Sequence, residues 1–109
     1  MLFRSLAVTG ATRSAQFPEA QTFRDQGIDF MDDVDAWYAV MAPGKTSPEL
    51  VHRLNADVNA VMAAPDLRES LVKQGLVPVT STPEELGALV RSDLVRWAKV
   101  VADAKISMD

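Results

Sequence analysis

The stretch from Ala36 to Met62 constrains the fold more than any other part of this sequence. It opens with an unbroken apolar run, Ala36 to Met41, that is too short for a lone helix and too continuous for a half-exposed strand. Such a run predicts a strand covered on both faces, as in α/β proteins. Pro43 and Gly44 end the strand, because neither residue suits a continuing ladder of hydrogen bonds.

A helix is predicted directly after this turn, and two residues compete for its N-cap. If Thr46 is the cap, its hydroxyl accepts a hydrogen bond from the amide of Glu49 and the Glu49 carboxylate reaches back, which completes a capping box. Alternatively, Ser47 is the cap and Pro48 takes the first helical position. The helical spacing predicts an apolar face made of Leu50, Leu54, Val58 and Val61. The polar residues that lie mostly off this face are Arg53, Asn55, Asp57 and Asn59.

Shorter elements are predicted before the central strand. Residues 5–9 (SLAVT) favour a short strand, and residues 10–14 (GATRS) form a polar turn that closes it. Arg13 in this turn suggests an anion site, but the glycine spacing of a phosphate loop is missing, so an ordinary strand-end turn is preferred. Residues 19–26 predict a short helix that Gly27 stops.

Four aspartates crowd the loop that leads into the central strand. Clustered carboxylates can hold calcium, but the spacing of an EF-hand, with its central glycine and terminal glutamate, is absent. A solvated acidic loop is therefore preferred to a metal site for Asp29, Asp32, Asp33 and Asp35.

Two more helices are predicted after the central one. Pro65 opens a short helix that Gly75 ends, and residues 76–79 then favour a short strand or an extended connector because of Pro78. A capping box at Thr82 to Glu85 starts the longest helix, which we expect to end near Lys105. Its predicted buried face consists of Leu86, Val90, Leu94, Trp97 and Val101.

Composition narrows the functional classes. The 109 residues suffice for one small domain, and the net charge of −4, with dispersed Lys and Arg, argues against a nucleic-acid binder. The absence of cysteine removes disulfide, zinc-thiolate and cysteine-nucleophile chemistry. The first ten residues have too short an apolar part for a signal peptide, so the chain as written is expected to stay in the cytoplasm.

Few residues suggest chemistry. His52, the only histidine, has no obvious nucleophile or proton partner in sequence, so it is interpreted as a surface or boundary residue. Trp37 and Tyr38 are candidates to line a ligand cleft, although aromatic residues in such a strand more often belong to the core. We predict no catalytic residue, no metal site and no cofactor, and hence no enzyme.

The order of five segments is similar to one family. SLAVTGATRS, FPEAQTFRDQG, AWYAVMAPGKTSPELVHRLNADVN, APDLRESLVKQGLVPV and TPEELGALVRSDLVRWAKVVADAKI follow one another along essentially the whole chain. This order resembles the C-terminal part of Bug-type receptors, the periplasmic solute-binding proteins of tripartite tricarboxylate transporters. The sequence departs from the family pattern at Ala39, where a glycine is common, at the GKTSP turn, at Ala64 and in the acidic MDDVD stretch.

The resemblance implies a partial periplasmic-binding-protein-like α/β fold, with short strands and three main helices. Residues 1–109 would form a single C-terminal fragment of a two-domain receptor, about three times as long, that closes on a small carboxylate. Trp37 and Tyr38 lie nearest the expected cleft, and the implied partners are the carboxylate and the membrane subunits of the transporter.

A third of a two-domain fold leaves apolar faces uncovered, so we also expect a homo-oligomer, either a homodimer or a higher oligomer. The fragment is expected to be unable to bind ligand alone. The alternative hypothesis is a small cytoplasmic oligomerising module derived from the same fold.

Overall fold

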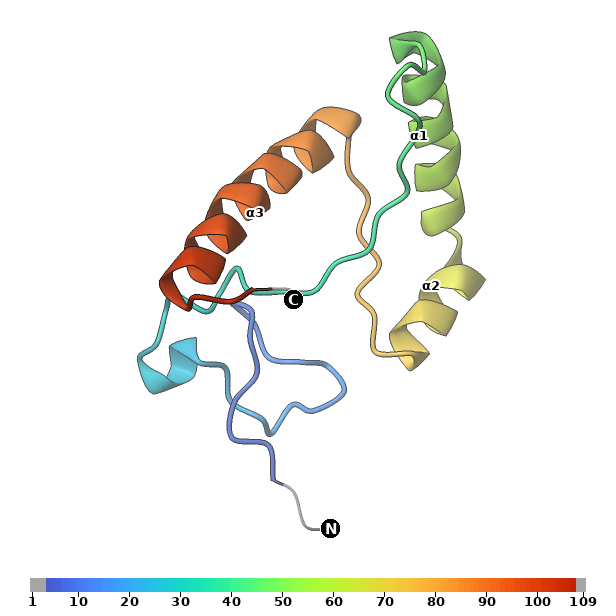
Figure 1. Ribbon diagram of the computed structural model, residues 1–109. Coiled ribbons are helices and arrows are strands. Elements are labelled where there is room, and N and C mark those ends of the chain that lie inside the picture. Colours follow the sequence, from blue (N-terminus) through green and yellow to red (C-terminus); the bar gives the residue numbers. More distant parts are fainter. Residues whose placement is uncertain (1–3, 108–109) are drawn as a thin grey trace. The chain divides into compact units, whose positions relative to one another are not determined.

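The computed structural model describes residues 4–107, and these divide into two compact units at the junction of Met41 and Ala42. The N-terminal unit holds one short 3₁₀ helix, η1 (Arg24–Gln26). The C-terminal unit holds three α-helices, α1 (Pro48–Met62), α2 (Pro65–Lys73) and α3 (Pro83–Asp103) (Figure 1). None of the described helices is both long enough and apolar enough to span a membrane.

Proline fixes the start of all three α-helices. A residue that precedes proline is disfavoured in the helical region, so it remains extended and becomes the N-cap. Ser47, Ala64 and Thr82 accordingly have ψ angles of 145°, 130° and 162°. The first residue of each α-helix is therefore set by a proline in the sequence.

The same rule decides between the two predicted caps of α1. Ser47 is the N-cap, and its hydroxyl accepts a hydrogen bond from the amide of Leu50 at 3.3 Å. The capping box predicted at Thr46 and Glu49 is wrong, because it would require Ser47 to be helical directly before Pro48.

The predicted capping box of α3 is confirmed. The Glu85 amide donates to the Thr82 hydroxyl at 3.1 Å, and the Thr82 amide donates to the Glu85 carboxylate at 2.8 Å.

Left-handed residues end α2 and α3. After α2, Gly75 has φ 82°, its amide donates to Val72, and the amide of Leu76 donates to Leu71, which is a Schellman motif. After α3, Lys105 takes the same place with φ 52°. The helix itself ends at Asp103, two residues before the predicted end.

The α/β prediction included helices and strands, and the described residues contain the helices but not the strands. Residues 36–41 and 76–79 have no strand pairing, and residues 5–9 contribute one isolated parallel bridge, between Val8 and Thr22. The run 36–41 is exposed rather than buried, with Tyr38 86% exposed. A strand needs a neighbour for its N–H and C=O groups, and no neighbouring strand is present in the described chain.

The N-terminal unit is built around the Val8 bridge. The Val8 amide donates to the Gln21 carbonyl at 2.9 Å, and the Phe23 amide donates to the Val8 carbonyl at 3.1 Å. The helix predicted over residues 19–26 is shortened to η1, and Gly27, with φ 82°, ends it as expected.

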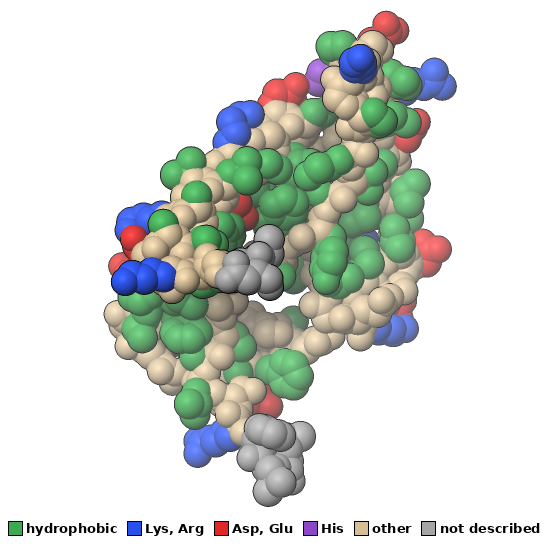
Figure 2. All heavy atoms as spheres, viewed as in Figure 1, with side chains coloured by type: hydrophobic (Ala, Val, Ile, Leu, Met, Phe, Trp, Pro, Cys, Tyr) green, Lys and Arg blue, Asp and Glu red, His purple; other side chains and the backbone are tan. Residues whose placement is uncertain are grey.

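Little of the described chain is buried. Ala20 and Thr22 are the buried residues, and none of the α-helices contains a fully buried residue. Hydrophobic side chains, green in Figure 2, accordingly lie at the visible surface of the helices. α2 and α3 each contact α1, but they do not contact each other. The helices are amphipathic as predicted, yet their apolar faces lack a common core.

Candidate functional site

The predicted ligand-contacting pair lies at the end of the N-terminal unit. Tyr38 is largely exposed and Trp37 is 38% exposed. The backbone of residues 38–41 makes no backbone–backbone hydrogen bond within the described chain. Tyr38 is therefore accessible to a ligand, and its main-chain groups are not committed to a strand pairing within the described chain.

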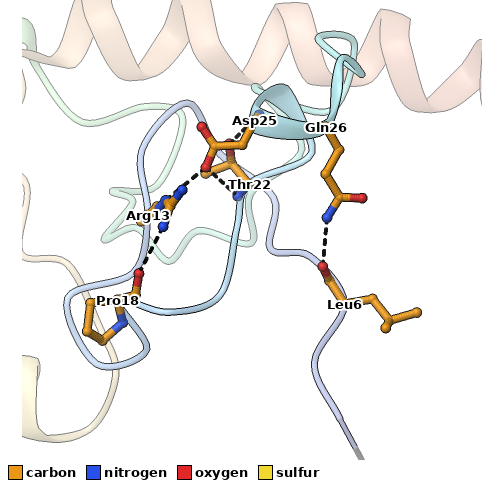
Figure 3. Close-up of polar contacts among 6 residues, drawn as sticks. All are labelled: Leu6, Arg13, Pro18, Thr22, Asp25 and Gln26. Carbon is orange, nitrogen blue, oxygen red and sulfur yellow. Dashed lines mark hydrogen bonds and ion pairs between the residues drawn. The ribbon is translucent and has the colours of Figure 1, made fainter.

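A polar network around Thr22 and Asp25 organises the same unit (Figure 3). The Thr22 amide donates to Asp25 Oδ2 at 3.1 Å, and the Asp25 amide donates to the Thr22 hydroxyl at 3.0 Å. These reciprocal bonds resemble a capping box at the start of the short η1 turn. Gln26 adds a bond from its side-chain amide to the Leu6 carbonyl at 2.8 Å. Thr22 is only 2% exposed, so the network encloses the most buried side chain of the described residues.

Arg13 joins this network instead of facing solvent as a free cation. Its Nε donates to Asp25 Oδ2 at 2.8 Å, and its Nη1 donates to the Pro18 carbonyl at 3.3 Å. Hydrogen bonds from the Thr22 amide, and then from Arg13, lower the pKa of the Asp25 carboxyl below its ordinary value. The guanidinium is thus committed to an internal carboxylate, which favours the structural turn over an anion site.

The acidic loop is held by internal contacts as well. Arg24 pairs with Asp32, with Nε donating to Oδ2 at 2.6 Å, and the Thr9 hydroxyl donates to Asp35 at 3.3 Å. Over residues 4–107, no group of three or more acidic or imidazole side chains is placed to hold a metal ion.

A second polar cluster links α1 to the start of α3, and we call it the Asn clamp. Asn55 and Asn59 donate from their Nδ2 atoms to the Ser81 carbonyl at 2.8 and 3.0 Å. Asn59 Nδ2 also lies 3.3 Å from Asn55 Oδ1. Ser81 precedes the Thr82 cap, so the clamp fixes the N-terminus of α3 against the side of α1.

Sequence reasoning missed the Asn clamp, because it assigned both asparagines to the polar side of α1. The signal was present in their spacing of four residues, which places them on one face of the helix. His52, on the same helix, lies 3.5 Å from Glu84 through its Nε2 atom, and both side chains are exposed. His52 is thus a surface residue at the α1–α3 contact, which agrees with the sequence interpretation.

Comparison with known proteins gives one consistent result. The family model described as "Tripartite tricarboxylate transporter family receptor" matches residues 2–106. A "UPF0065 protein in tcbD-tcbE intergenic region" from Pseudomonas sp. (strain P51) is 35% identical over 104 residues, which cover 95% of this chain and 31% of that protein.

"Protein BugT" from Bordetella pertussis is 33% identical over 101 residues, covering 92% of this chain and 30% of BugT. A "UPF0065 protein in clcB-clcD intergenic region" from Pseudomonas knackmussii is 23% identical over 104 residues, covering 95% of this chain and 62% of that protein. The chain therefore spans about a third of the length of the first two relatives.

Proposed function

The chain belongs to the tripartite tricarboxylate transporter receptor family, and from this we propose that it supplies the C-terminal part of a two-domain periplasmic receptor for small carboxylates. The observation that carries the proposal is the match of the family model to residues 2–106, which leaves almost no residue outside it. Members of this family are transport receptors rather than enzymes. The complete receptor would deliver its ligand to the membrane subunits of the transporter.

The exposed apolar faces support the view that this chain is one part of a larger binding unit. Each helix of the C-terminal unit has an apolar stripe, but none contains a buried residue. A ligand site that encloses a small molecule usually buries most of its surface in a concave, largely preformed pocket. We therefore propose that the isolated chain does not bind carboxylates and that the remaining part of a receptor is needed to complete the cleft.

Trp37 and Tyr38 are the residues we propose to face that cleft. The exposed Tyr38 hydroxyl is a hydrogen-bond donor suited to a carboxylate oxygen, and the Trp37 ring offers an apolar wall.

A chimera tests the proposal most directly. The region of BugT that matches this chain is replaced by the chain itself, and thermal unfolding is followed with a panel of di- and tricarboxylates. A bound ligand stabilises a protein by roughly 2.7 kcal/mol at a hundredfold excess over its Kd. We expect a saturable shift for the folded chimera and none for the isolated chain. The proposal would be contradicted if a carboxylate stabilised intact BugT but no carboxylate of the panel stabilised the folded chimera.

Two variants of the chimera test the placement of the aromatic pair. Replacement of both Trp37 and Tyr38 by alanine is expected to raise the Kd of the chimera for the carboxylate at least about tenfold, which corresponds to a loss of about 1.4 kcal/mol in binding free energy. The matched control is Val77→Ala, which truncates another exposed side chain outside any strand pairing. Equal affinity of the aromatic variant and the control would remove the pair from the cleft while leaving the receptor assignment intact.

A further inference from the structure

The acidic loop is tied to the turn at Thr9 and Gly10 just before the aromatic pair begins. The Thr9 hydroxyl donates to Asp35 Oδ1 at 3.3 Å, across 26 residues of sequence. The Gly10 amide donates to the Met31 carbonyl at 3.3 Å, and the same carbonyl accepts from the Val34 amide at 3.4 Å. Both ends of the segment from Met31 to Asp35 are therefore held against one turn.

Gly10 lets this turn lie close to the Asp35 carboxylate. Its φ of 92° is in the left-handed region, which glycine adopts at little cost. A β-carbon at this position would lie 3.5 Å from Asp35 Oδ1 and 3.6 Å from Oδ2. The carboxylate therefore lies beside the Gly10 backbone as well as the Thr9 hydroxyl.

Asp35 is close enough in sequence to control where the aromatic pair lies. Two residues of chain span at most roughly 7 Å, so an anchor at Asp35 limits the positions open to Trp37. The backbone of residues 38–41 makes no backbone–backbone hydrogen bond within the described chain. An anchor just before these residues therefore affects the position of Tyr38 more than it would in a paired strand. All of these residues belong to the N-terminal unit.

We propose that the hydrogen bond between Thr9 and Asp35 positions Trp37 and Tyr38 for the ligand cleft, which makes Asp35 a positioning residue of the receptor. The proposal rests on the proposed function, because it takes the aromatic pair to face a carboxylate. The role requires an acceptor oxygen at position 35 and a hydroxyl at position 9, but not the negative charge. A direct electrostatic effect of Asp35 on a carboxylate ligand would depend on that charge instead.

The BugT chimera measures the effect on binding. The probe is the di- or tricarboxylate of the panel that stabilises intact BugT most strongly. Asp35→Ala and Thr9→Val each remove the bond and are expected to raise the Kd for the probe about two- to tenfold, the range that one net hydrogen bond contributes. Asp35→Asn keeps an acceptor oxygen and Thr9→Ser keeps a hydroxyl, so both are expected to retain the native Kd. Asp29→Ala is the matched control, because it removes an exposed carboxylate of the same loop and leaves the Thr9 bond in place.

The double variant separates one shared bond from two independent effects. Thr9→Val combined with Asp35→Ala is expected to raise the Kd no further than either substitution alone, since the same bond is lost in all three. Additive effects, or an unchanged Kd in Asp35→Ala, would overturn the proposal. An equal rise of the Kd in Asp35→Asn and Asp35→Ala would also overturn it, because the charge would then be what matters.

Trp37 fluorescence tests the same bond in the isolated chain, where carboxylate binding is not needed. In a Trp97→Phe background, Asp35→Ala and Thr9→Val are both expected to change the quenching of Trp37 by acrylamide, and Asp35→Asn is expected to keep the native value. Unchanged quenching in the first two variants would overturn the positioning role. If the unsubstituted chimera binds no carboxylate, the proposed function fails, and the quenching comparison then decides the positioning role by itself.

Discussion

The Asn clamp makes a quantitative prediction, because two side chains share one acceptor. Asn55 and Asn59 both donate to the part-buried Ser81 carbonyl. A net hydrogen bond of this kind contributes roughly 0.5 to 1.5 kcal/mol, and an acceptor left with no partner costs about 1 to 3 kcal/mol. Replacing one asparagine leaves the carbonyl with a donor, whereas replacing both leaves it with none.

The two substitutions are therefore expected to be non-additive. Asn55→Ala or Asn59→Ala alone should cost about 0.5 to 1 kcal/mol, and the double variant about 2 to 3 kcal/mol, so the coupling energy is about 1 kcal/mol. Alanine also favours a helix over asparagine by up to about 0.7 kcal/mol per site. Asp57 is an exposed position on the same helix, so Asp57→Ala is the control. It measures how much a change to alanine stabilises α1 when no clamp contact is lost.

The assay is urea unfolding followed by Trp97 fluorescence in a Trp37→Phe background, so that the signal comes from α3. Every variant is compared at one fixed protein concentration. If the cost of the double variant equals the sum of the two single costs, the shared-acceptor reasoning is refuted. If the clamp variants behave like Asp57→Ala, the clamp does not hold α3 to α1.

Three further outcomes are expected. The Asp25 carboxyl has a lowered pKa in the folded chain, so its stabilising effect is present above the unfolded value of about 3.9 and is lost as the pH falls through the folded value. Asp25→Asn should therefore remove part of the acid transition of the N-terminal unit, seen by Trp37 fluorescence in a Trp97→Phe background, and an unchanged transition would contradict the network. Ser47→Ala should cost about 1 kcal/mol in urea unfolding and Thr46→Ala close to nothing, because Ser47 is the cap of α1; the reverse order would restore the rejected capping box. Lys105→Gly should raise the thermal midpoint, by up to about 1 kcal/mol in stability, because glycine relieves the left-handed backbone strain at φ 52°; a lowered midpoint would show that the lysine side chain makes a compensating contact.

Local rules predicted the helices well because helix signals are carried by neighbouring residues. Pro65, Thr82 and Gly75 each have the predicted role. The capping box at Thr46 was wrong because it overlooked that Ser47, which precedes Pro48, is disfavoured in the helical region. The helix α3 ends at Asp103, close to the predicted end near Lys105, but the left-handed conformation of Lys105 was not predicted, since sequence favours glycine there.

Strands and long-range polar contacts were harder to predict, because their partners are distant in the chain. The run 36–41 has the composition of a buried strand, but burial and pairing depend on other segments, and the described residues supply neither. The contact of Asn59 with the Ser81 carbonyl spans 22 residues, and nothing local to either residue specifies it. Sequence similarity identified the family, while the positions of Trp37 and Tyr38 in a cleft stay a prediction.

Within the described residues, Ala20 and Thr22 are the buried ones, so packing inside each unit stabilises the chain less than a full core would. Several ion pairs among residues 4–107 join exposed side chains, such as Lys73 with Glu69, and exposed pairs contribute little to stability. Caps and the Asn clamp add roughly several kcal/mol in total, which is small beside the conformational entropy of ordering about a hundred residues. The apolar faces are therefore the remaining source of stabilisation, and they contribute only when something covers them. It follows that the unfolding midpoint of the native chain should rise with protein concentration if association of copies covers the apolar faces of the helices, and should be independent of concentration if it does not.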